Sequence, residues 1–137
     1  MLALLVWREA RGESRAARVA VAGTVLNRVR RPSWWGDSIL SVVFKKWQYS
    51  SLTDPHDPQL TTWPSSFDQV WLECLEVAAN VLDGTDHTTM PGADSYFDRS
   101  IPAPAWATPN IYVGQIGRLR FYNVDRDYEG ASSPQRG

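Results

Sequence analysis

The chain of 137 residues has a single cysteine, only two histidines and no long hydrophobic run. One cysteine excludes an internal disulfide, and the apolar neighbours of Cys74 predict a buried, unreactive thiol. No stretch is long enough to span a bilayer, so we expect no membrane insertion. The two histidines stand in no HExxH-like arrangement, whereas a catalytic zinc needs about three protein ligands. A zinc amidase is therefore disfavoured, and we expect neither a metal nor another cofactor.

Neither sign of charge dominates the chain. The net charge is −1, so no strong overall field favours nucleic acid or an anionic membrane as a partner. A glycine-rich phosphate loop is also missing, and nucleotide chemistry has no support. The basic residues are nevertheless uneven, because half of them lie in the first quarter: Arg8, Arg11, Arg15, Arg18, Arg28, Arg30 and Arg31. Such a basic end fits either approach to an anionic cell wall or a solvated helix face.

Two helices are predicted at the N-terminal end. Residues 2–11 are apolar with an Arg/Glu end, and Gly12 is suited to end a helix. Ser14 can cap a second helix that runs to about residue 31, where Pro32 stops it. Its apolar stripe consists of Val19, Ala22, Val25, Leu26 and Val29, and the arginines lie mainly off that stripe.

An irregular segment follows. Asp37 or Ser38 can cap a short third helix, and residues 45–64 form a long polar loop of the kind that usually carries function. Asp54, His56 and Asp57 lie among prolines in this loop, which favours a turn over an ion site.

The clearest helix is predicted next. Ser66 opens it, Gln69 completes a capping box three residues on, and Gly84 closes it. Its predicted buried stripe consists of Phe67, Val70, Trp71, Cys74, Val77, Ala78, Val81 and Leu82.

Short strands are predicted towards the C-terminus. Residues 95–98, 111–116 and 119–124 have strand patterns, and Gly117-Arg118 forms a tight turn between the last two. The chain is therefore expected to be one α+β domain over residues 1–124, with helices first and a small antiparallel sheet last. The polar residues 125–137 are expected to form a loosely ordered tail.

One segment resembles a known family. The sequence EARGE at residues 9–13, followed by VAVA at 19–22 and VLNRV at 25–29, closely resembles the cell wall hydrolases of the spore cortex-lytic type. Weaker matches follow in the same order: QYS at 48–50, GA at 92–93, YF at 96–97, PAW at 104–106, IG at 116–117 and FY at 121–122. Together they cover about residues 2–123.

The resemblance implies a lysozyme-like fold and a lytic transglycosylase that cuts the MurNAc–GlcNAc backbone of peptidoglycan. Its catalytic acid would be Glu9, the first glutamate of the motif. The chemistry agrees, because a glycosidic oxygen leaves only when a carboxyl group protonates it. In the last turn of a helix, the negative end of the helix dipole disfavours ionisation of Glu9. Arg8 and Arg11 are expected to point away from its carboxyl.

The role of Glu13 is left between two alternatives. It either helps to start the second helix, as acidic groups near a helix N-terminus do, or acts as a second carboxylate of the site. A transglycosylase needs one carboxyl only, because the C6 hydroxyl of MurNAc is the nucleophile. Hydrolysis by a muramidase would need a second carboxylate, for which Asp37, Asp54, Asp57, Asp94 and Asp98 are available.

Six further residues are candidate substrate contacts: Gln48, Ser50, Tyr96, Asp98, Trp106 and Tyr122. Where many relatives carry histidines, this chain has Ser95, Phe97 and Leu119, so no histidine is expected to assist.

The expected partner is the glycan strand of bacterial peptidoglycan, bound by a monomer. Seven tryptophans keep one alternative open, a non-catalytic wall-binding module. Residues 1–7 are too short for the apolar core of a signal peptide. We therefore expect either an enzyme released during phage lysis or a trimmed domain of an exported enzyme.

Overall fold

The computed structural model describes residues 1–31, 36–45 and 49–124, apart from the side chain of Ser50. Within these ranges the helices precede the strands, which confirms the predicted α+β order. The helices are α1 (Leu2–Ala10), α2 (Arg15–Arg30), α3 (Ile39–Val43), α4 (Ser50–Thr53) and α5 (Gln69–Asp83), with 3-10 turns at Pro58–Thr61 and Pro109–Ile111. The strands are β1 (Ser95–Asp98), β2 (Tyr112–Ile116) and β3 (Leu119–Tyr122). The predicted tail, residues 125–137, lies outside the described ranges, as does Pro32.

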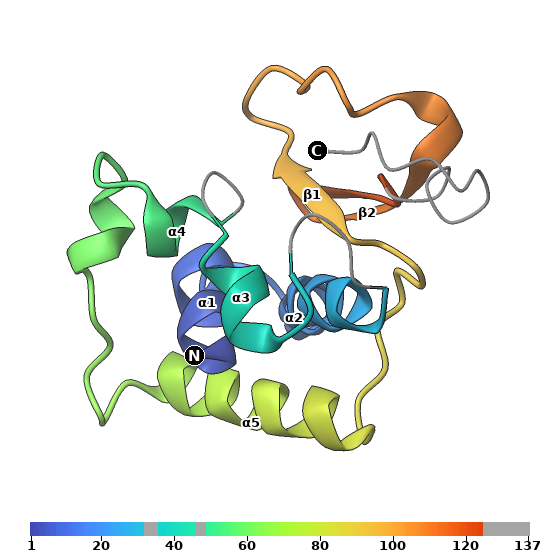
Figure 1. The fold of residues 1–137 in the computed structure, drawn as a ribbon. Coiled ribbons are helices and arrows are strands. Elements are labelled where there is room, and N and C mark those ends of the chain that lie inside the picture. The colour runs from blue at the N-terminus through green and yellow to red at the C-terminus, as the bar shows by residue number, and fades with distance from the viewer. Residues whose placement is uncertain (32–35, 46–48, 125–137) are drawn as a thin grey trace.

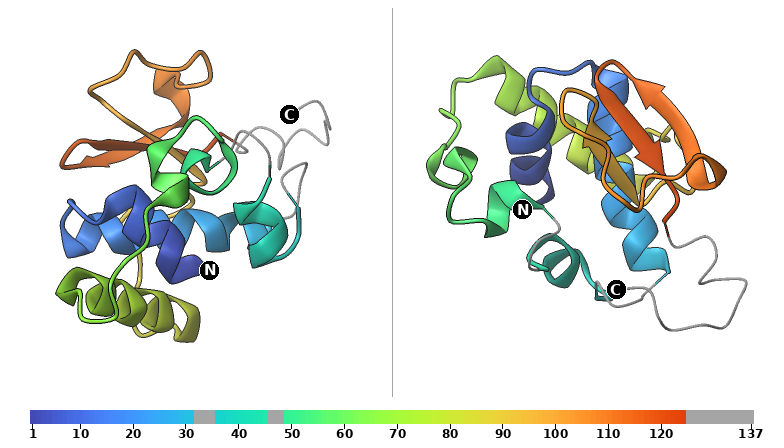
Figure 2. Two further views of the ribbon diagram at one scale, coloured as in Figure 1. Left: turned by 90° about the vertical axis from the view of Figure 1, so that its left-hand side faces the viewer. Right: turned by 90° about the horizontal axis from the view of Figure 1, so that it is seen from above.

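The molecule has two lobes. In the helical lobe, α1 and α2 lie between α5 on one side and the sheet on the other, which both Figure 1 and the left view of Figure 2 show. The sheet and the segment that connects β1 to β2 form the second lobe. Residues from both lobes share one apolar core, because Leu119 and Phe121 of β3 belong to the same buried cluster as α1, α2 and α5. Burial of this continuous core is the main stabilising contribution.

The cap predicted for the second helix is confirmed. Ser14 is the N-cap of α2, and its side chain accepts a hydrogen bond from the Ala17 amide. Helix α1 ends at Ala10, two residues before Gly12, which does not adopt the left-handed conformation. Ser38 caps α3. Residues 49–64, within the predicted loop, include α4 and a 3-10 turn, and the rest of the segment is irregular.

The start of α5 differs from the prediction. The helix begins at Gln69, and its N-cap is Asp68, whose carboxylate accepts hydrogen bonds from the amides of Val70 and Trp71. Ser66 therefore does not cap it, and Phe67 lies outside the helix with 91% of its surface exposed. Leu82, at 52%, is also exposed, so the predicted stripe is too wide. Its centre (Cys74, Val77, Ala78 and Val81) is buried as expected, and Gly84 ends the helix with φ +84°.

The sheet is antiparallel, and β3 lies between β1 and β2. Tyr96 pairs with Phe121, whereas Ser95 pairs with Tyr122. Because side chains alternate along a strand, Tyr96 and Phe121 face the helices, and Phe97 and Tyr122 face away from them. Gly117, with φ +56°, forms the predicted turn between β2 and β3.

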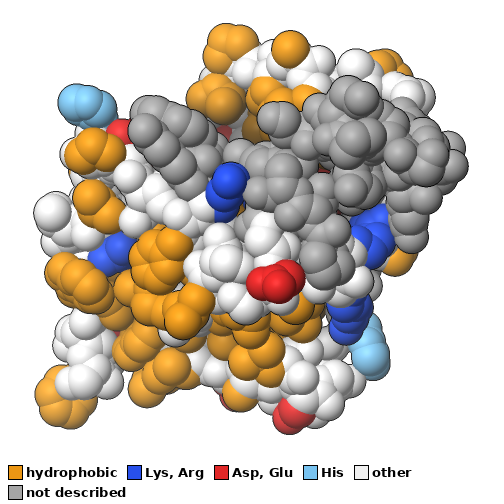
Figure 3. Space-filling model, viewed as in Figure 1, with side chains coloured by type: hydrophobic (Ala, Val, Ile, Leu, Met, Phe, Trp, Pro, Cys, Tyr) orange, Lys and Arg blue, Asp and Glu red, His pale blue; other side chains and the backbone are white. Residues whose placement is uncertain are grey.

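Several large apolar side chains stay exposed on the helical lobe. Figure 3 shows hydrophobic side chains gathered on the left and lower part of one face, over the N-terminus and the helices. The exposed residues of these elements include Met1, Leu40, Phe44, Leu72 and Leu75. In the described part of the chain, no helix combines the length and the apolar character needed to cross a membrane.

Candidate active site

Glu9 is the exceptional residue of α1. The other eight residues of this helix are buried, whereas Glu9 stays partly exposed in its last turn. A carboxylate is costly to bury without partners, so a partly open position suits it. The helix is held from all other sides by core packing, which fixes the position of the Glu9 backbone.

Tyr96 of β1 reaches Glu9 from the sheet lobe. Its hydroxyl donates a hydrogen bond to Glu9 Oε1 over 2.6 Å. Burial, and then the charge of Glu9, raise the pKa of Tyr96 well above its usual range. The phenol therefore keeps its proton and remains a donor at neutral pH. Within the described residues Glu9 Oε2 makes no hydrogen bond, so one carboxyl oxygen is held and the other is free to meet a ligand.

The C-terminal half of α2 positions β1. Three side chains donate to consecutive carbonyl oxygens just before the strand: Arg31 to Gly92 (2.9 Å), Asn27 to Ala93 (2.8 Å) and Arg28 to Asp94 (2.7 Å). Arg28 also donates to Ser95 Oγ over 3.3 Å. Asn27 and Arg28 are buried, so the VLNRV segment fixes the strand that carries Tyr96.

Tyr49 is a second aromatic residue beside Tyr96. The two rings are 6.4 Å apart, and the Tyr49 hydroxyl forms a hydrogen bond with Thr24 Oγ1 (3.0 Å). The Arg28 guanidinium lies 5.0 Å from the centre of the Tyr49 ring. Burial raises the pKa of Tyr49. Arg28 of α2 thus supports both tyrosines, because it lies against the Tyr49 ring and holds Asp94 and Ser95, which lead into the strand of Tyr96.

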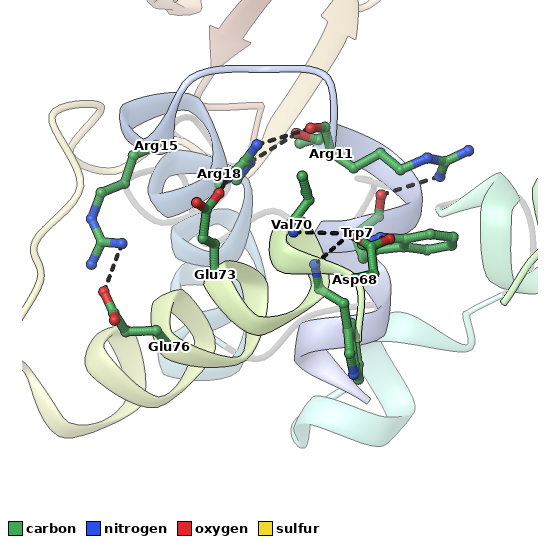
Figure 4. A network of polar contacts seen from close by, with 10 residues as sticks. Trp7, Arg11, Arg15, Arg18, Asp68, Val70, Glu73 and Glu76 are labelled. Carbon is green, nitrogen blue, oxygen red and sulfur yellow. Dashed lines mark hydrogen bonds and ion pairs between the residues drawn. The ribbon is translucent and has the colours of Figure 1, made fainter. Parts of the chain in front are cut away.

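Arg18 occupies the end of α1. It donates to the carbonyl oxygens of Ala10 (3.4 Å) and Arg11 (2.9 Å) and pairs with Glu73 of α5 at 2.9 Å (Figure 4). The negative pole of α1 therefore faces a buried cation. The dipole at this end is compensated, contrary to the assumption of the sequence argument.

Arg8 and Arg11 point away from Glu9, as expected. Arg8 donates to the carbonyl oxygens of Thr62 (3.1 Å) and Ser51 (3.0 Å), and its guanidinium lies 4.5 Å from the Trp63 ring centre. Arg11 donates to Gln59 Oε1 over 2.6 Å. Because Arg8, Arg18 and Arg28 are buried and bonded within the protein, the prediction of a solvated basic face is wrong for these three.

Glu13 lies against the β2–β3 turn. A Cβ atom on Gly117 would come within 3.0 Å of its Oε1 atom. No hydrogen bond joins Glu13 to Glu9 or Tyr96, all three of which are described. Glu13 thus touches the sheet lobe from the loop between α1 and α2, and it precedes the N-cap of α2 instead of lying in its first turn.

Trp106 and Tyr122 are not brought to Glu9. Both belong to an aromatic cluster on the outer face of the sheet, where Tyr122 stacks on Phe97 at 5.8 Å and meets Trp106 edge-on at 5.5 Å. They therefore lie on the face of the sheet opposite Tyr96, and their role as substrate contacts stays a prediction. Asp98 ends β1, and its carboxylate accepts a hydrogen bond from the Ser100 amide. Gln48 and the side chain of Ser50 lie outside the described part of the chain.

The other acidic candidates are engaged locally. Asp94 is fully buried and accepts hydrogen bonds from Ser95 Oγ and the Val124 amide. Asp54 and Asp57 accept from the backbone amides of His56 and Gln59, which confirms the turn interpretation. Asp37 is exposed beside α3. Glu13, partly buried against the sheet lobe, remains an alternative as a second carboxylate.

Sequence reasoning did not identify Asn27, Arg28 and Tyr49 as parts of the site. Asn27 and Arg28 fall off the apolar stripe of α2, and such residues normally face solvent. Their only sequence signal was membership in the segments that resemble the family.

Comparison with known proteins identifies relatives of this chain. A family model described as Cell Wall Hydrolase matches residues 12–122, and the match begins three residues after Glu9. The chain is 27% identical over 127 residues to the spore cortex-lytic enzyme of Halalkalibacterium halodurans, and 28% identical over 123 residues to that of Oceanobacillus iheyensis. These matches cover 90% and 88% of the chain but 34% and 40% of the relatives. The chain therefore spans well under half of their length.

Two solved structures share the fold. They are the catalytic domain of the germination-specific lytic transglycosylase SleB from Bacillus anthracis and the catalytic domain of the Bacillus cereus SleB protein. Each has a TM-score of 0.69 and 23% identity and covers 89% of this chain. The matches extend over 90% and 86% of those domains. This confirms the fold that the sequence resemblance implied.

Proposed function

Because the chain belongs to the cell wall hydrolase family, we propose that it cleaves the MurNAc–GlcNAc backbone of peptidoglycan with Glu9 as its catalytic acid. One observation carries the proposal: α1 buries every residue except Glu9, and a tyrosine from the sheet lobe holds one oxygen of that carboxyl. A surface glutamate without a function needs neither the rigid helix nor the tyrosine partner from the other lobe. The relatives named as spore cortex-lytic enzymes and lytic transglycosylase support the same substrate class.

The proposed reaction is a lytic transglycosylation. Protonated Glu9 donates its proton to the bridging glycosidic oxygen as the bond to C1 of MurNAc breaks. The Glu9 carboxylate then takes the proton of the MurNAc C6 hydroxyl, whose oxygen attacks C1 and closes a 1,6-anhydro ring. Glu9 ends protonated, and no water is consumed. Tyr96 positions the carboxyl throughout, so that the free Oε2 atom faces the sugar.

A muramidase that uses water is the second candidate. Inverting hydrolysis needs two carboxyl groups about 6.5–9.5 Å apart, and retaining hydrolysis needs about 5–5.5 Å. Glu13 is the acidic residue to consider, since it lies beside the sheet lobe near the end of α1. A wall-binding module without catalysis is the third candidate, and it would not need the Glu9–Tyr96 pair.

The enzyme is proposed to act in the cell wall as a monomer. Glu9, Tyr96 and the groups that hold them all come from one chain, so the site needs no second copy. Whether it reaches the wall by phage lysis or as part of an exported enzyme does not change the chemistry.

The test is mass spectrometry of the fragments released from purified peptidoglycan. The wild type should release muropeptides that end in 1,6-anhydro-MurNAc, and Glu9→Gln should release none, because an amide cannot donate the required proton. Glu13→Gln is the matched control variant, with the same change of charge and size four residues away, and should retain most of the activity. Circular dichroism should show both variants folded.

The fragments distinguish the alternatives. Reducing-end muropeptides from the wild type would establish a muramidase, and equal loss of activity in folded Glu9→Gln and Glu13→Gln would contradict a single-carboxyl mechanism. Free peptides beside intact glycan would reveal an amidase or peptidase and reject the proposal. Binding to sacculi without released fragments would favour the wall-binding module.

A further inference from the structure

The outer face of the sheet carries a groove that takes no part in the Glu9 site. Phe97 and Arg120 pair across β1 and β3 and face away from the helices, on the side opposite Tyr96. A depression of about 530 Å³ opens here, with Phe97 in its wall. A second depression of about 440 Å³ adjoins the first, because Arg120 and Ala103 line both, and the two depressions together are called the groove.

Three arginines line the first depression: Arg99, Arg118 and Arg120. The Arg99 amide donates to the Arg118 carbonyl oxygen over 2.7 Å, which holds the backbones of these two residues side by side, and Arg120 Nε donates to Gln115 Oε1 over 3.1 Å. Among the described residues that line this depression, none is acidic. Several guanidinium groups in one depression suit a carboxylate or another planar oxyanion.

Two acidic side chains lie near the arginines without neutralising them. Asp98 is 3.9 Å from Arg118, and its carboxylate is directed to the Ser100 amide at 2.9 Å. That hydrogen bond, and next the two neighbouring arginines, hold the pKa of Asp98 below its ordinary value. Glu13 meets the β2–β3 turn at Gly117. With three cations against these two anions, the groove keeps a positive charge.

The second depression presents aromatic surface. Tyr112 is 46% exposed, and Tyr122 lies beside it with a ring separation of 5.4 Å. Aromatic rings of this kind pack against sugar rings and aliphatic side chains, so the groove offers an apolar contact next to its arginines. Its ligand should therefore carry an anionic group and an uncharged body within one molecule.

We propose that this groove binds the carboxylate groups of the peptide stems that peptidoglycan carries, as a second contact with the wall. The inference rests on the proposed function for its choice of polymer. Because the groove and Glu9 lie on opposite faces of the sheet, the groove holds a different part of the wall network from the glycan bond that is cut. Its arginines raise affinity for the insoluble wall and leave the chemical step alone.

The experiment measures binding to purified sacculi by co-sedimentation, in the Glu9→Gln background so that the wall stays intact. The double variant Arg118→Gln/Arg120→Gln should bind about tenfold or more weakly than the parent, because two charge-assisted contacts are lost. The double variant Arg15→Gln/Arg30→Gln removes the same charge from α2 and should bind like the parent. Arg99→Gln serves as a second groove variant if the double variant melts below the assay temperature.

The ligand is tested by changing the sacculi. Sacculi whose stem carboxylates are converted to amides should bind the parent as weakly as native sacculi bind the groove variant. Sacculi stripped of phosphate-containing wall polymers should bind the parent unchanged. Equal binding to native and amidated sacculi would overturn the proposal, and so would a loss of binding on stripping, which would identify phosphate as the ligand.

Activity separates this inference from the proposed function. On glycan strands freed of their peptides, the groove variant with Glu9 intact should match the wild type, whereas on whole sacculi it should be slower. If the wild type releases no fragments from either substrate, the proposed function fails while the binding comparison still decides the groove. If the wild type is active and the groove variant matches the Arg15/Arg30 control on sacculi, the groove inference alone fails.

Discussion

At the scale of the residue, one hydrogen bond connects the two lobes at the carboxyl group proposed to react. Tyr96 can be donor to ionised Glu9 or acceptor from protonated Glu9 without moving. Such a partner serves a residue that changes from acid to base within one turnover.

Tyr96→Phe tests this role. The variant should lower kcat about tenfold or more, because the carboxyl loses its positioning contact, while KM changes little. The measurement is steady-state kinetics on purified peptidoglycan, with circular dichroism to show that the variant is folded.

Tyr49→Phe is the matched control. It removes the buried Tyr49 hydroxyl, which forms a hydrogen bond with Thr24, from the ring that lies next to Tyr96. Its kcat should stay close to the wild-type value even if its stability falls. An equal loss of kcat in both folded variants would show that Tyr96 acts only through packing.

At the scale of the element, contacts at the helix ends determine the position of the candidate site. Asp68 both caps α5 and accepts a hydrogen bond from Trp7 Nε1 of α1 at 3.3 Å, and these contacts lie beside the Arg18–Glu73 pair in Figure 4. One carboxylate therefore sets the start of α5 and its register against the helix that bears Glu9.

Asp68→Ala should lower the free energy of unfolding by about 1–2 kcal/mol, the usual cost of an N-cap, measured by urea denaturation. Asp68→Asn keeps an acceptor oxygen and should cost less than half of that. Ser66→Ala should have almost no effect, because Ser66 does not cap the helix. A larger effect of Ser66→Ala than of Asp68→Ala would contradict the observed helix start.

These elements also show how far sequence reasoning reaches. Ser14, Ser38, Gly84 and the Gly117 turn were predictable because cap and turn chemistry is local. The pair Ser66 and Gln69 matches the capping-box pattern, yet Asp68 is the N-cap of α5. A short polar run offers several side-chain acceptors, and packing selects one of them.

The residues of the candidate site likewise divide into those that the sequence predicts and those that it does not. Glu9 and Tyr96 were identified from the resemblance to the family. The buried Arg28 was not, because a helix stripe cannot show that the opposite side of α2 is covered by the chain entering β1. The position of Trp106 and Tyr122 on the outer face of the sheet was not predictable, since the register of a three-stranded sheet depends on pairings that residue spacing does not specify.

At the scale of the whole molecule, the candidate site lies where two lobes with different anchoring meet. The helical lobe holds α1 by core packing, whereas β1 is fixed to it by side-chain donors of α2, with Arg28 at their centre. The geometry at Glu9 therefore depends on this polar connection as well as on the shared apolar core. Loss of that connection should loosen the sheet lobe without unfolding the helices.

Arg28→Lys tests this dependence, because lysine keeps the charge but cannot donate to the Asp94 carbonyl and to Ser95 Oγ in the same fork. We expect faster amide hydrogen exchange in β1 and β3 by a factor that corresponds to about 1.5–3 kcal/mol. Amides of α1 and α5 should stay protected, and kcat should fall as the Tyr96 hydroxyl loses its position. Arg15→Lys, at the exposed pairs with Glu76 and Asp86, should change stability by less than about 0.5 kcal/mol. Equal loss of protection in both lobes would mean that Arg28 supports the whole core, and the two-lobe account of the site would be wrong.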